Sequence, residues 1–284
     1  MQNRQERSKT GDCIAISHLA YLVRGGIILR LMFARTRQAF QVGSGRWVAV
    51  VMAAVAFAVY LTTLAPGLTH ENYGADGGDL IAAARTLGVP HPPGYPTYTL
   101  LAWLFSHLPV GILAYRVNLL SAVSAALAVA LLYLTSQLLQ PPDEHPVWIP
   151  AATSLVFAFS PLLWSQAVIT EVYALHTLFA SLLLWLLVRW RTGARDPLIW
   201  LAAFTLGLGL GNHLTIIFVA PAALVLLWSE RQRWFRVRVL LPAILAFILG
   251  LSIYVYLPLA AAQRPPVNWG NPQTWRGFLW TVTA

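Results

Sequence analysis

Charged residues are scarce in this 284-residue chain: aspartate, glutamate, lysine and arginine make up 10% of it, against about 25% in soluble domains. Lysine is almost absent, with one residue among nineteen basic ones, and cysteine is limited to Cys13. A single cysteine excludes an intrachain disulfide framework and a cluster of thiolate metal ligands. The chain is instead 58% hydrophobic with a mean hydropathy of +0.64, which indicates an integral membrane protein.

Long apolar runs separated by basic turns predict an all-α membrane protein with about seven membrane-spanning helices. An apolar stretch at 96–109 is too short to cross a bilayer and is expected to lie at the interface. The glycines Gly207, Gly209 and Gly211 are expected to let neighbouring helices approach closely. The expected spans are 47–66, 112–139, 147–163, 167–188, 198–211, 214–228 and 239–260.

The distribution of basic residues favours one orientation in the membrane. With the N-terminus in the cytoplasm, the cytoplasmic segments contain 15 of the 19 lysine and arginine residues and the outer segments contain four. The positive-inside rule therefore places the first loop, 66–111, on the outer face. The net charge of +9 is assigned to topology, and no nucleic-acid partner is expected.

Three regions are predicted. Residues 1–46 form a basic cytoplasmic segment, expected to be an amphipathic helix on the inner membrane surface, with a mistaken start codon as the alternative. Residues 47–262 form the transmembrane module. Residues 263–284 form an outer tail rich in aromatic residues, proline and asparagine, and the chain is either a fragment or a minimal form.

Polar residues that lie in or near the apolar segments gather on the predicted outer side. Ionisable side chains at membrane depth are costly and are therefore functional candidates. Their arrival from five separate places predicts a single polar cavity at the outer interface. The residues are Glu71, Asp76, Asp79, Arg85, His91, Arg116, Asn118, Glu171, His176, Asn212, His213, Arg264, Asn268 and Asn271.

The two aspartates of the first loop have a structural alternative. Asp76 and Asp79 are spaced as the N-cap and N3 residues of a helix that ends at Gly88, which is a capping-box arrangement. This role is compatible with catalysis by either carboxylate. Glu171 is harder to explain structurally, because no basic residue lies four positions away in SQAVITEVYALHTLF. Its partner must come from another helix or from a ligand.

Other candidates also have structural alternatives. His91 precedes two prolines and is suited to a stiff turn. Arg116 can extend to lipid headgroups, and His176 is expected to be a packed interior histidine. Neither an HExxH motif nor a clustered His/Asp spacing is present, so no metal site is predicted. No glycine-rich nucleotide loop follows a strand pattern either.

Several motifs together resemble a known family. They are DGGDLIAAARTLGVPHPPGYPTYTLLAWLF, VNLLSAVSAAL, WSQAVITEVYALHTLF and GLGLGNHL, in this order. The sequence resembles, over about 47–275, a large family of polytopic proteins whose animal member is a protein O-mannosyltransferase of the endoplasmic reticulum. The resemblance implies a GT-C-like glycosyltransferase with a bundle of about seven helices. It also implies a large first outer loop with short interfacial helices and a catalytic carboxylate.

The resemblance further implies a reaction. A sugar, with mannose implied by the animal relative, moves with inversion from a polyprenyl-phosphate lipid donor to a hydroxyl of a protein Ser/Thr or of a glycan. Asp76 is the expected base, with Asp79 as the second candidate or its partner. Glu171 is expected to orient sugar hydroxyls or to hold a cation. His91, Arg116, His213 and Arg264, in this order, are the candidates for the lipid phosphate, and Tyr95 and Tyr173 are further substrate-binding candidates.

Two other classes of function stay open. The same cavity would suit a transporter or flippase for a lipid-linked or anionic solute, but transporters often have broken helices in matching halves, and no halves match here. The other alternative is a non-catalytic subunit in envelope assembly. No cofactor besides the lipid-linked sugar is expected, and a divalent cation and the oligomeric state stay open. The expected location is a bacterial plasma membrane, with the active site on the outer face.

Overall fold

The computed structural model of the chain describes residues 45–141, 146–193 and 195–284. The chain divides into two units, Met1–Trp47 and Val48–Ala284, and each is considered by itself. Apart from its last two residues, the basic segment predicted at 1–46 lies outside the described residues. Everything that follows concerns the second unit and the helix that leads into it.

The regular structure of the described residues is helical, and one isolated parallel bridge joins Val89 to Asn268. After the helix Gly45–Thr63, the elements are η1 (Glu71–Tyr73), α2 (Gly77–Thr86), α3 (Pro96–Ser106), α4 (Leu113–Leu138), α5 (Trp148–Ala158), α6 (Pro161–Ala167), α7 (Tyr173–Arg191) and α8 (Pro197–Leu210). They continue with η2 (Leu214–Val219), α9 (Ala220–Ser229), α10 (Arg231–Trp234), α11 (Val237–Leu251), η3 (Ser252–Val255), α12 (Tyr256–Ala262) and α13 (Trp275–Thr283).

The all-α membrane fold is confirmed, but seven spans are not reproduced. Within the described ranges, four helices are long and apolar enough to cross a membrane: Gly45–Thr63, α4, α7 and Val237–Ala262. The bent pair of α5 and α6 provides a fifth if it is counted as one span. Pro197–Leu210 and Leu214–Ser229, which were predicted to be spans five and six, are shorter apolar helices. They fall below the roughly 20 residues that cross the hydrocarbon core.

A break at Pro161 explains why the predicted spans three and four have other boundaries. Proline has no N–H with which to continue the preceding helix, and Ser160 caps the new one by accepting from the N–H of Leu163. The axes of α5 and α6 therefore differ by 63°. The chain leaves α6 after Ala167, so Glu171 lies in a non-helical connection before α7 rather than inside a span at 167–188.

The long helices pack through small residues. In lipid, close contact of backbones replaces much of the hydrophobic driving force that operates in water. A Cβ atom on Gly207 of α8 would lie 2.6 Å from the backbone of both Phe247 and Leu251 on α11. This confirms that glycine in this stretch permits close helix approach. On α4, Ala122 and Ala125 are likewise completely buried, in a core cluster that includes Ala158 of α5 and Ala167 of α6.

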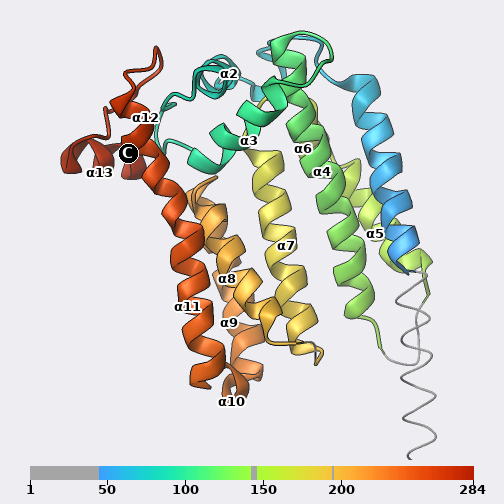
Figure 1. Ribbon diagram of the computed structural model, residues 1–284. Helices are drawn as coiled ribbons and strands as arrows, with labels where there is room; N and C mark the ends of the chain where they lie inside the picture. Colours follow the sequence, from blue (N-terminus) through green and yellow to red (C-terminus); the bar gives the residue numbers. More distant parts are fainter. Residues whose placement is uncertain (1–44, 142–145, 194) are drawn as a thin grey trace, which may run out of the picture. The chain divides into compact units, whose positions relative to one another are not determined.

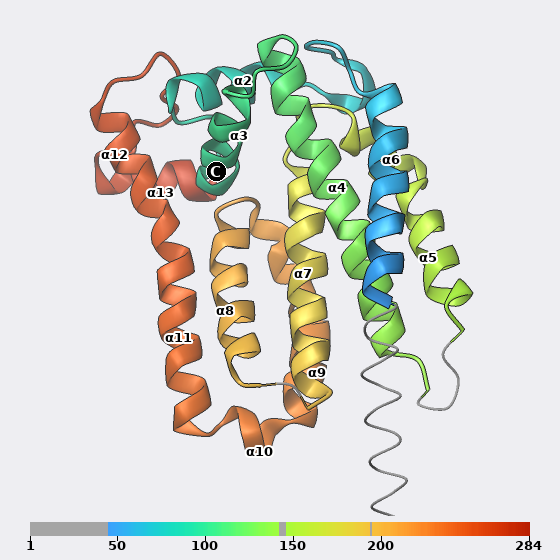
Figure 2. The same ribbon diagram turned by 45° about the vertical axis from the view of Figure 1, so that its right-hand side comes forward.

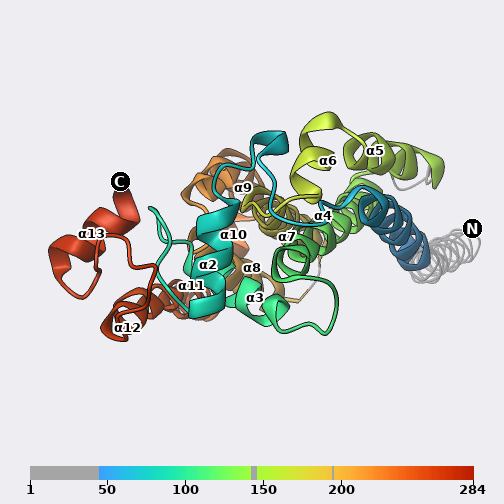
Figure 3. The same ribbon diagram turned by 90° about the horizontal axis from the view of Figure 1, so that it is seen from above.

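The short helices α2 and α3 lie at one end of the helical unit, where α4 and α7 begin (Figures 1 and 2). The view from above shows both lying across the ends of the long helices rather than beside them (Figure 3). The stretch predicted to be interfacial at 96–109 therefore forms the 11-residue α3. The segment α10 lies at the opposite end, between α9 and α11 (Figure 1). The predicted site residues of the first loop belong to the α2–α3 end.

Candidate functional site

A histidine between two carboxylates forms the centre of the site. Asp79 Oδ2 accepts from both the backbone N–H of His91, at 2.9 Å, and its ring Nδ1, at 2.8 Å. On the other side of the ring, His91 Nε2 lies 3.5 Å from Asp76 Oδ2. Asp76 is the more accessible carboxylate, with 50% of its side chain exposed against 24% for Asp79. The arrangement orients His91 through Asp79 and directs its second nitrogen toward Asp76.

The capping-box explanation of the two aspartates is wrong. Asp76 does occupy the N-cap position of α2, but its side chain makes no capping hydrogen bond. Asp79, in the first turn, directs its carboxylate to His91 instead of back to the start of the helix. The Asp76 carboxylate is therefore not engaged by the helix that positions it.

The turn that carries His91 is shaped by its glycine and by the C-terminal segment. Gly94 has φ of +84°, and a Cβ there would approach Leu257 and Thr281 to about 3 Å. Only glycine suits both the backbone angle and the space. Just before the turn, Val89 donates its N–H to Val267 O and accepts from the N–H of Trp269. The tail predicted at 263–284 is thus packed against the first loop.

That packing introduces a residue which the sequence reasoning missed. The indole Nε1–H of Trp269 donates to Asp79 Oδ1 at 3.1 Å. Both oxygens of Asp79 are then engaged by donors, whereas among the described residues the carboxylate of Asp76 has only the 3.5 Å approach of His91. The sequence offered little signal, because tryptophan in an aromatic, Asn- and Pro-rich tail is also typical of a membrane interface.

The charges of the central trio reinforce one another. The hydrogen bond to Asp79 raises the pKa of His91, burial opposes this, and the charge of Asp76 adds to the rise. For Asp79, burial acts to raise the pKa, but the hydrogen bonds from His91 and Trp269 outweigh it and lower the pKa. Both groups therefore favour their charged forms, a His91 cation beside an Asp79 anion.

Glu171 is buried beside this trio. Its side chain is 2% exposed, and within the described part of the chain its Oε1 has no hydrogen-bond partner. A Cβ on Gly77 would lie 3.4 Å from Thr170 O, so the start of α2 packs against the residue that precedes Glu171. Burial first, and the charge of Asp76 second, raise the pKa of Glu171 to about 7. Glu171 can therefore exchange a proton near neutral pH.

The raised pKa of Glu171 predicts a pH-dependent stability. Its ordinary value is 4.5 and its folded value is about 7, so the folded state holds the extra proton between these values. The contribution of protonated Glu171 to the free energy of unfolding is fully present below pH 4.5, and it is lost as the pH rises through 7. We expect Glu171→Gln to raise the thermal midpoint of the purified protein at pH 8 by a few degrees, roughly the effect of 1 kcal/mol or more, and to change it little at pH 5.

The matched control for this measurement is Glu71→Gln, because Glu71 is an exposed carboxylate of the first loop. It should leave the midpoint unchanged at both pH values. An equal shift of the Glu171→Gln midpoint at pH 5 and pH 8 would show that protonation of Glu171 is not responsible.

A group of aromatic and histidine rings lies next to His91. The ring of Tyr95 meets that of His91 edge-on, with centroids 5.1 Å apart, and lies 6.2 Å from that of His213. The rings of Tyr173 and His176 lie 5.6 and 5.5 Å from that of His213. The structure thus brings together the substrate-binding candidates Tyr95, Tyr173 and His213 around the central trio. Such a ring-lined surface is typical of sites that bind sugars or other partly apolar ligands.

His213 is placed in this group as a neutral side chain. Its Nδ1 caps η2 by accepting from the N–H of Thr215 at 3.3 Å. Burial lowers the pKa of His213, so the ring offers hydrogen bonds rather than positive charge. The neighbouring Asn212 is fully buried and donates to Val172 O, and among the described residues its Oδ1 finds no partner.

Arg116 and Arg264 are not brought into this group. The guanidinium of Arg116 donates to the backbone carbonyls of Ser106, Val110 and Gly111 at 3.2, 2.8 and 2.9 Å. It holds the loop between α3 and α4 in place. Arg264 follows α12 with an exposed side chain. Of the four candidates for the lipid phosphate, His91 is therefore the one held between Asp76 and Asp79. Among the residues that the structure describes, no three His, Cys, Asp or Glu side chains are placed to share a metal ion.

Comparison with known proteins places the chain in a family. The family model described as the N-terminal domain of protein O-mannosyl-transferase TMEM260 matches residues 76–235. The chain belongs to the TMEM260 family. A mouse protein O-mannosyl-transferase TMEM260 is 41% identical over 247 residues, which cover 84% of this chain and 34% of the relative. A relative of the same name from Dictyostelium discoideum is 31% identical over 241 residues, covering 78% and 28%.

The chain spans about a third of the length of these TMEM260 relatives. No solved structure matches it. Both relatives come from eukaryotes, so they give no support to the predicted bacterial plasma membrane. The family match includes the trio of Asp76, Asp79 and His91 and also Glu171, whereas Trp269 lies beyond it.

Proposed function

We propose that this chain carries the catalytic core of a GT-C-like membrane glycosyltransferase that transfers a sugar from a polyprenyl-phosphate donor to a protein hydroxyl. The names of the TMEM260 relatives support O-mannosyl transfer to protein. The observation that carries the proposal is the position of His91, held by Asp79 beside an accessible Asp76. This arrangement offers a base for a hydroxyl and a positive charge for a phosphate at one place.

In the proposed reaction, Asp76 takes the proton of the acceptor hydroxyl as its oxygen attacks the anomeric carbon. The bond between that carbon and the donor phosphate oxygen breaks, and its electron pair leaves with the polyprenyl phosphate. Attack from the face opposite the leaving phosphate inverts the configuration. Asp76 suits the base role better than Asp79, because hydrogen bonds occupy both oxygens of Asp79.

The remaining residues are assigned roles by their positions. His91 stabilises the negative charge that develops on the departing phosphate. The rings of Tyr95, Tyr173 and His213 contact the sugar. The buried Glu171 adjusts the charge beside Asp76. The positive-inside count supports an active site on the non-cytoplasmic face, with the N-terminus in the cytoplasm. The exposed apolar faces of the helices support a donor whose lipid tail stays in the bilayer.

The test is donor turnover in membranes that contain the chain. Polyprenyl-phosphate [³H]mannose is supplied with and without a Ser/Thr-rich acceptor peptide, and both glycopeptide and released polyprenyl phosphate are measured. Release without acceptor reports slow transfer to water, so it does not depend on acceptor recognition. Absence of both products would overturn the proposal, and passage of intact donor across vesicles without release would favour a flippase.

Trp269→Phe tests how Asp79 is held. Losing the indole N–H raises the pKa of Asp79 and lets its carboxylate rotate away from His91, so we expect transfer at neutral pH to fall by roughly threefold to tenfold, in line with the loss of one partly exposed hydrogen bond to a charged group. The acid limb of the pH profile should move to higher pH. Trp275→Phe is the control, because Trp275 lies in the same segment and stacks on Phe278. An unchanged acid limb in Trp269→Phe would remove Trp269 from the site.

A further inference from the structure

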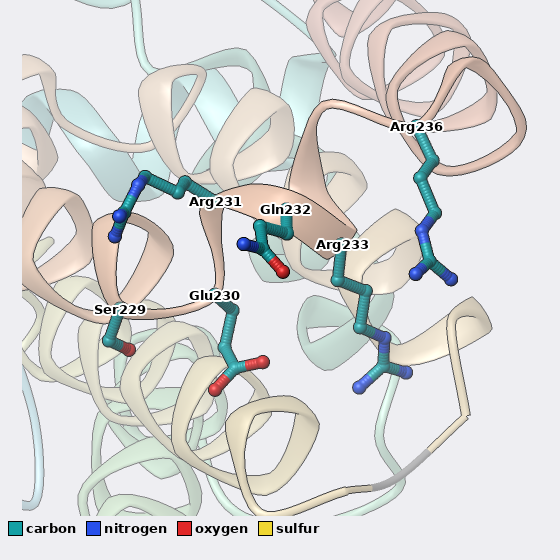
Figure 4. A pocket seen from close by; sticks show the side chains of 6 residues that line it. All are labelled: Ser229, Glu230, Arg231, Gln232, Arg233 and Arg236. Atoms are coloured by element: carbon teal, nitrogen blue, oxygen red, sulfur yellow. The ribbon is translucent and has the colours of Figure 1, made fainter.

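A basic pocket lies at the opposite end of the helical unit from the candidate site. It occupies the turn from α9 through α10 to α11 and has a volume of about 380 Å³. Figure 4 shows its lining side chains spread around the short α10. They are Ser229, Glu230, Arg231, Gln232, Arg233 and Arg236.

The wall of this pocket is fixed by Arg233. Its guanidinium pairs with Asp196 Oδ1 at 2.6 and 2.7 Å, donates to Trp190 O and lies over the Trp190 ring at 4.7 Å. Arg233 therefore ties α10 to the turn between α7 and α8. An arginine that donates two N–H groups to one carboxylate oxygen and stacks on an indole ring is held rigidly, and it gives the pocket a defined shape.

Two other arginines of the pocket keep their charge available. Arg231 is exposed and lies over the ring of Trp228 at 5.6 Å, and Arg236 is exposed with no ion pair or hydrogen bond of its guanidinium among the described residues. In Figure 4 the guanidinium groups of Arg233 and Arg236 extend from the same side of the ribbon. Glu230 is the acidic residue of the lining.

The surrounding charge is also positive. Arg238 lies close enough to act with Arg233 in lowering the pKa of Asp196, and Arg195 is exposed in the neighbouring turn. Five arginines, three of them in the pocket, thus face two carboxylates, Glu230 and Asp196. This end of the unit therefore keeps an excess of positive charge even when the Arg233–Asp196 ion pair is left out, and it attracts anions.

Exposed apolar side chains flank the pocket on both sides. Val225 and Trp228 of α9 are 72% and 67% exposed, and Phe235 and Val237, where α10 leads into α11, are 62% and 74% exposed. Apolar surface of this kind suits acyl chains, and tryptophan beside arginine is typical of the level of the headgroups. The pocket therefore combines an anion site with a lipid-facing rim.

We infer that this pocket binds the phosphate headgroup of an anionic phospholipid, with Arg236 contacting the phosphate beside the wall formed by Arg233, Arg231 adding positive charge at the other end of the pocket, and the acyl chains lying along α9 and α11. This site is separate from the Asp76–His91–Asp79 trio, and the inference does not depend on the proposed function. The arginines of this basic turn would then bind a specific ligand as well as orienting the protein in the membrane. The ligand is a lipid rather than free phosphate because the flanking apolar surface adds to the electrostatic attraction.

Native mass spectrometry of the purified protein tests this inference. Phosphatidylglycerol and phosphatidylcholine with identical acyl chains are titrated, and retained lipid is counted. We expect preferential retention of phosphatidylglycerol, and we expect Arg231→Gln with Arg236→Gln to lower its affinity about tenfold, because each arginine near an anionic headgroup contributes on the order of a few-fold or more. The pair Arg231→Lys with Arg236→Lys should retain most of the affinity.

Arg276→Gln is the matched control, because Arg276 is an exposed arginine of α13, near the other end of α11. It should bind phosphatidylglycerol like the wild type. Equal retention of the two lipids, or an equal loss in the control, overturns the inference. Displacement of the lipid by millimolar inorganic phosphate also overturns it and identifies a free-anion site. If the double glutamine variant does not fold, each single variant, expected to lose about threefold, replaces it.

Discussion

Asp76→Asn is expected to lower sugar transfer by a factor of about 10² to 10⁴, which is the usual contribution of a general base. Asparagine keeps the shape of the side chain and removes its ability to take a proton. The substitution should leave the fold intact, because Asp76 is half-exposed and its carboxylate does not cap α2. Transfer to peptide and release of polyprenyl phosphate to water should fall together, because both need the same proton acceptor.

Asp79→Asn, measured in the same assay, distinguishes the role of Asp76 from that of Asp79. Asp79→Asn should also reduce transfer, but it acts through His91, so it should additionally change the pH profile. Glu71→Gln is the control for loss of a carboxylate in the first loop and should retain full activity. Full transfer by Asp76→Asn together with loss in Asp79→Asn would assign the base to Asp79. Full transfer by both variants would remove the trio from catalysis.

The sequence was most informative where chemistry and spacing coincide. The polar segment 71–98 contributes Asp76, Asp79 and His91, and these residues do meet. Glu171 and His213 were singled out as costly polar residues in apolar surroundings, and they lie beside the trio. Each stands out because a charged or polar group in an apolar segment has few structural explanations.

The number of spans was predicted less well, for a physical reason. Hydropathy detects apolar stretches, but it does not separate a helix that crosses the bilayer from two shorter ones joined at a break. Pro161 divides one stretch, and the 3₁₀ turn after His213 shortens another. The contacts of Arg116 could not be predicted for a related reason, because the carbonyls that engage its guanidinium belong to a loop whose path the sequence does not specify.

Contacts between distant segments were the least predictable part. Trp269 reaches Asp79 across 190 positions of sequence, through pairing of Val89 with the backbone near Asn268. No periodicity or motif records such pairing, because it depends on how the loop and the tail pack after the helices have formed. The tail was therefore expected to be a separate outer segment, whereas it contributes a hydrogen bond to the centre of the site.

His91→Gln is the second substitution with a large expected effect. Glutamine can still donate one hydrogen bond but carries no charge, so the departing phosphate loses its cation. We expect the rate of transfer to fall about 10²- to 10³-fold, as when a preorganised donor to a developing anion is removed. The effect should appear mainly in kcat, because the additional negative charge develops in the transition state.

The pH profile gives the sharper test of His91. Its pKa is raised by the hydrogen bond to Asp79, so in the wild type the active cation persists to a higher pH than an ordinary histidine would allow. Transfer should therefore fall as the pH rises through this raised pKa, and His91→Gln should lose that alkaline limb along with its rate. His70→Gln, at an exposed histidine of the same loop, should retain both. An alkaline limb that survives in His91→Gln would assign it to another group and leave His91 as a turn residue that orients Asp79.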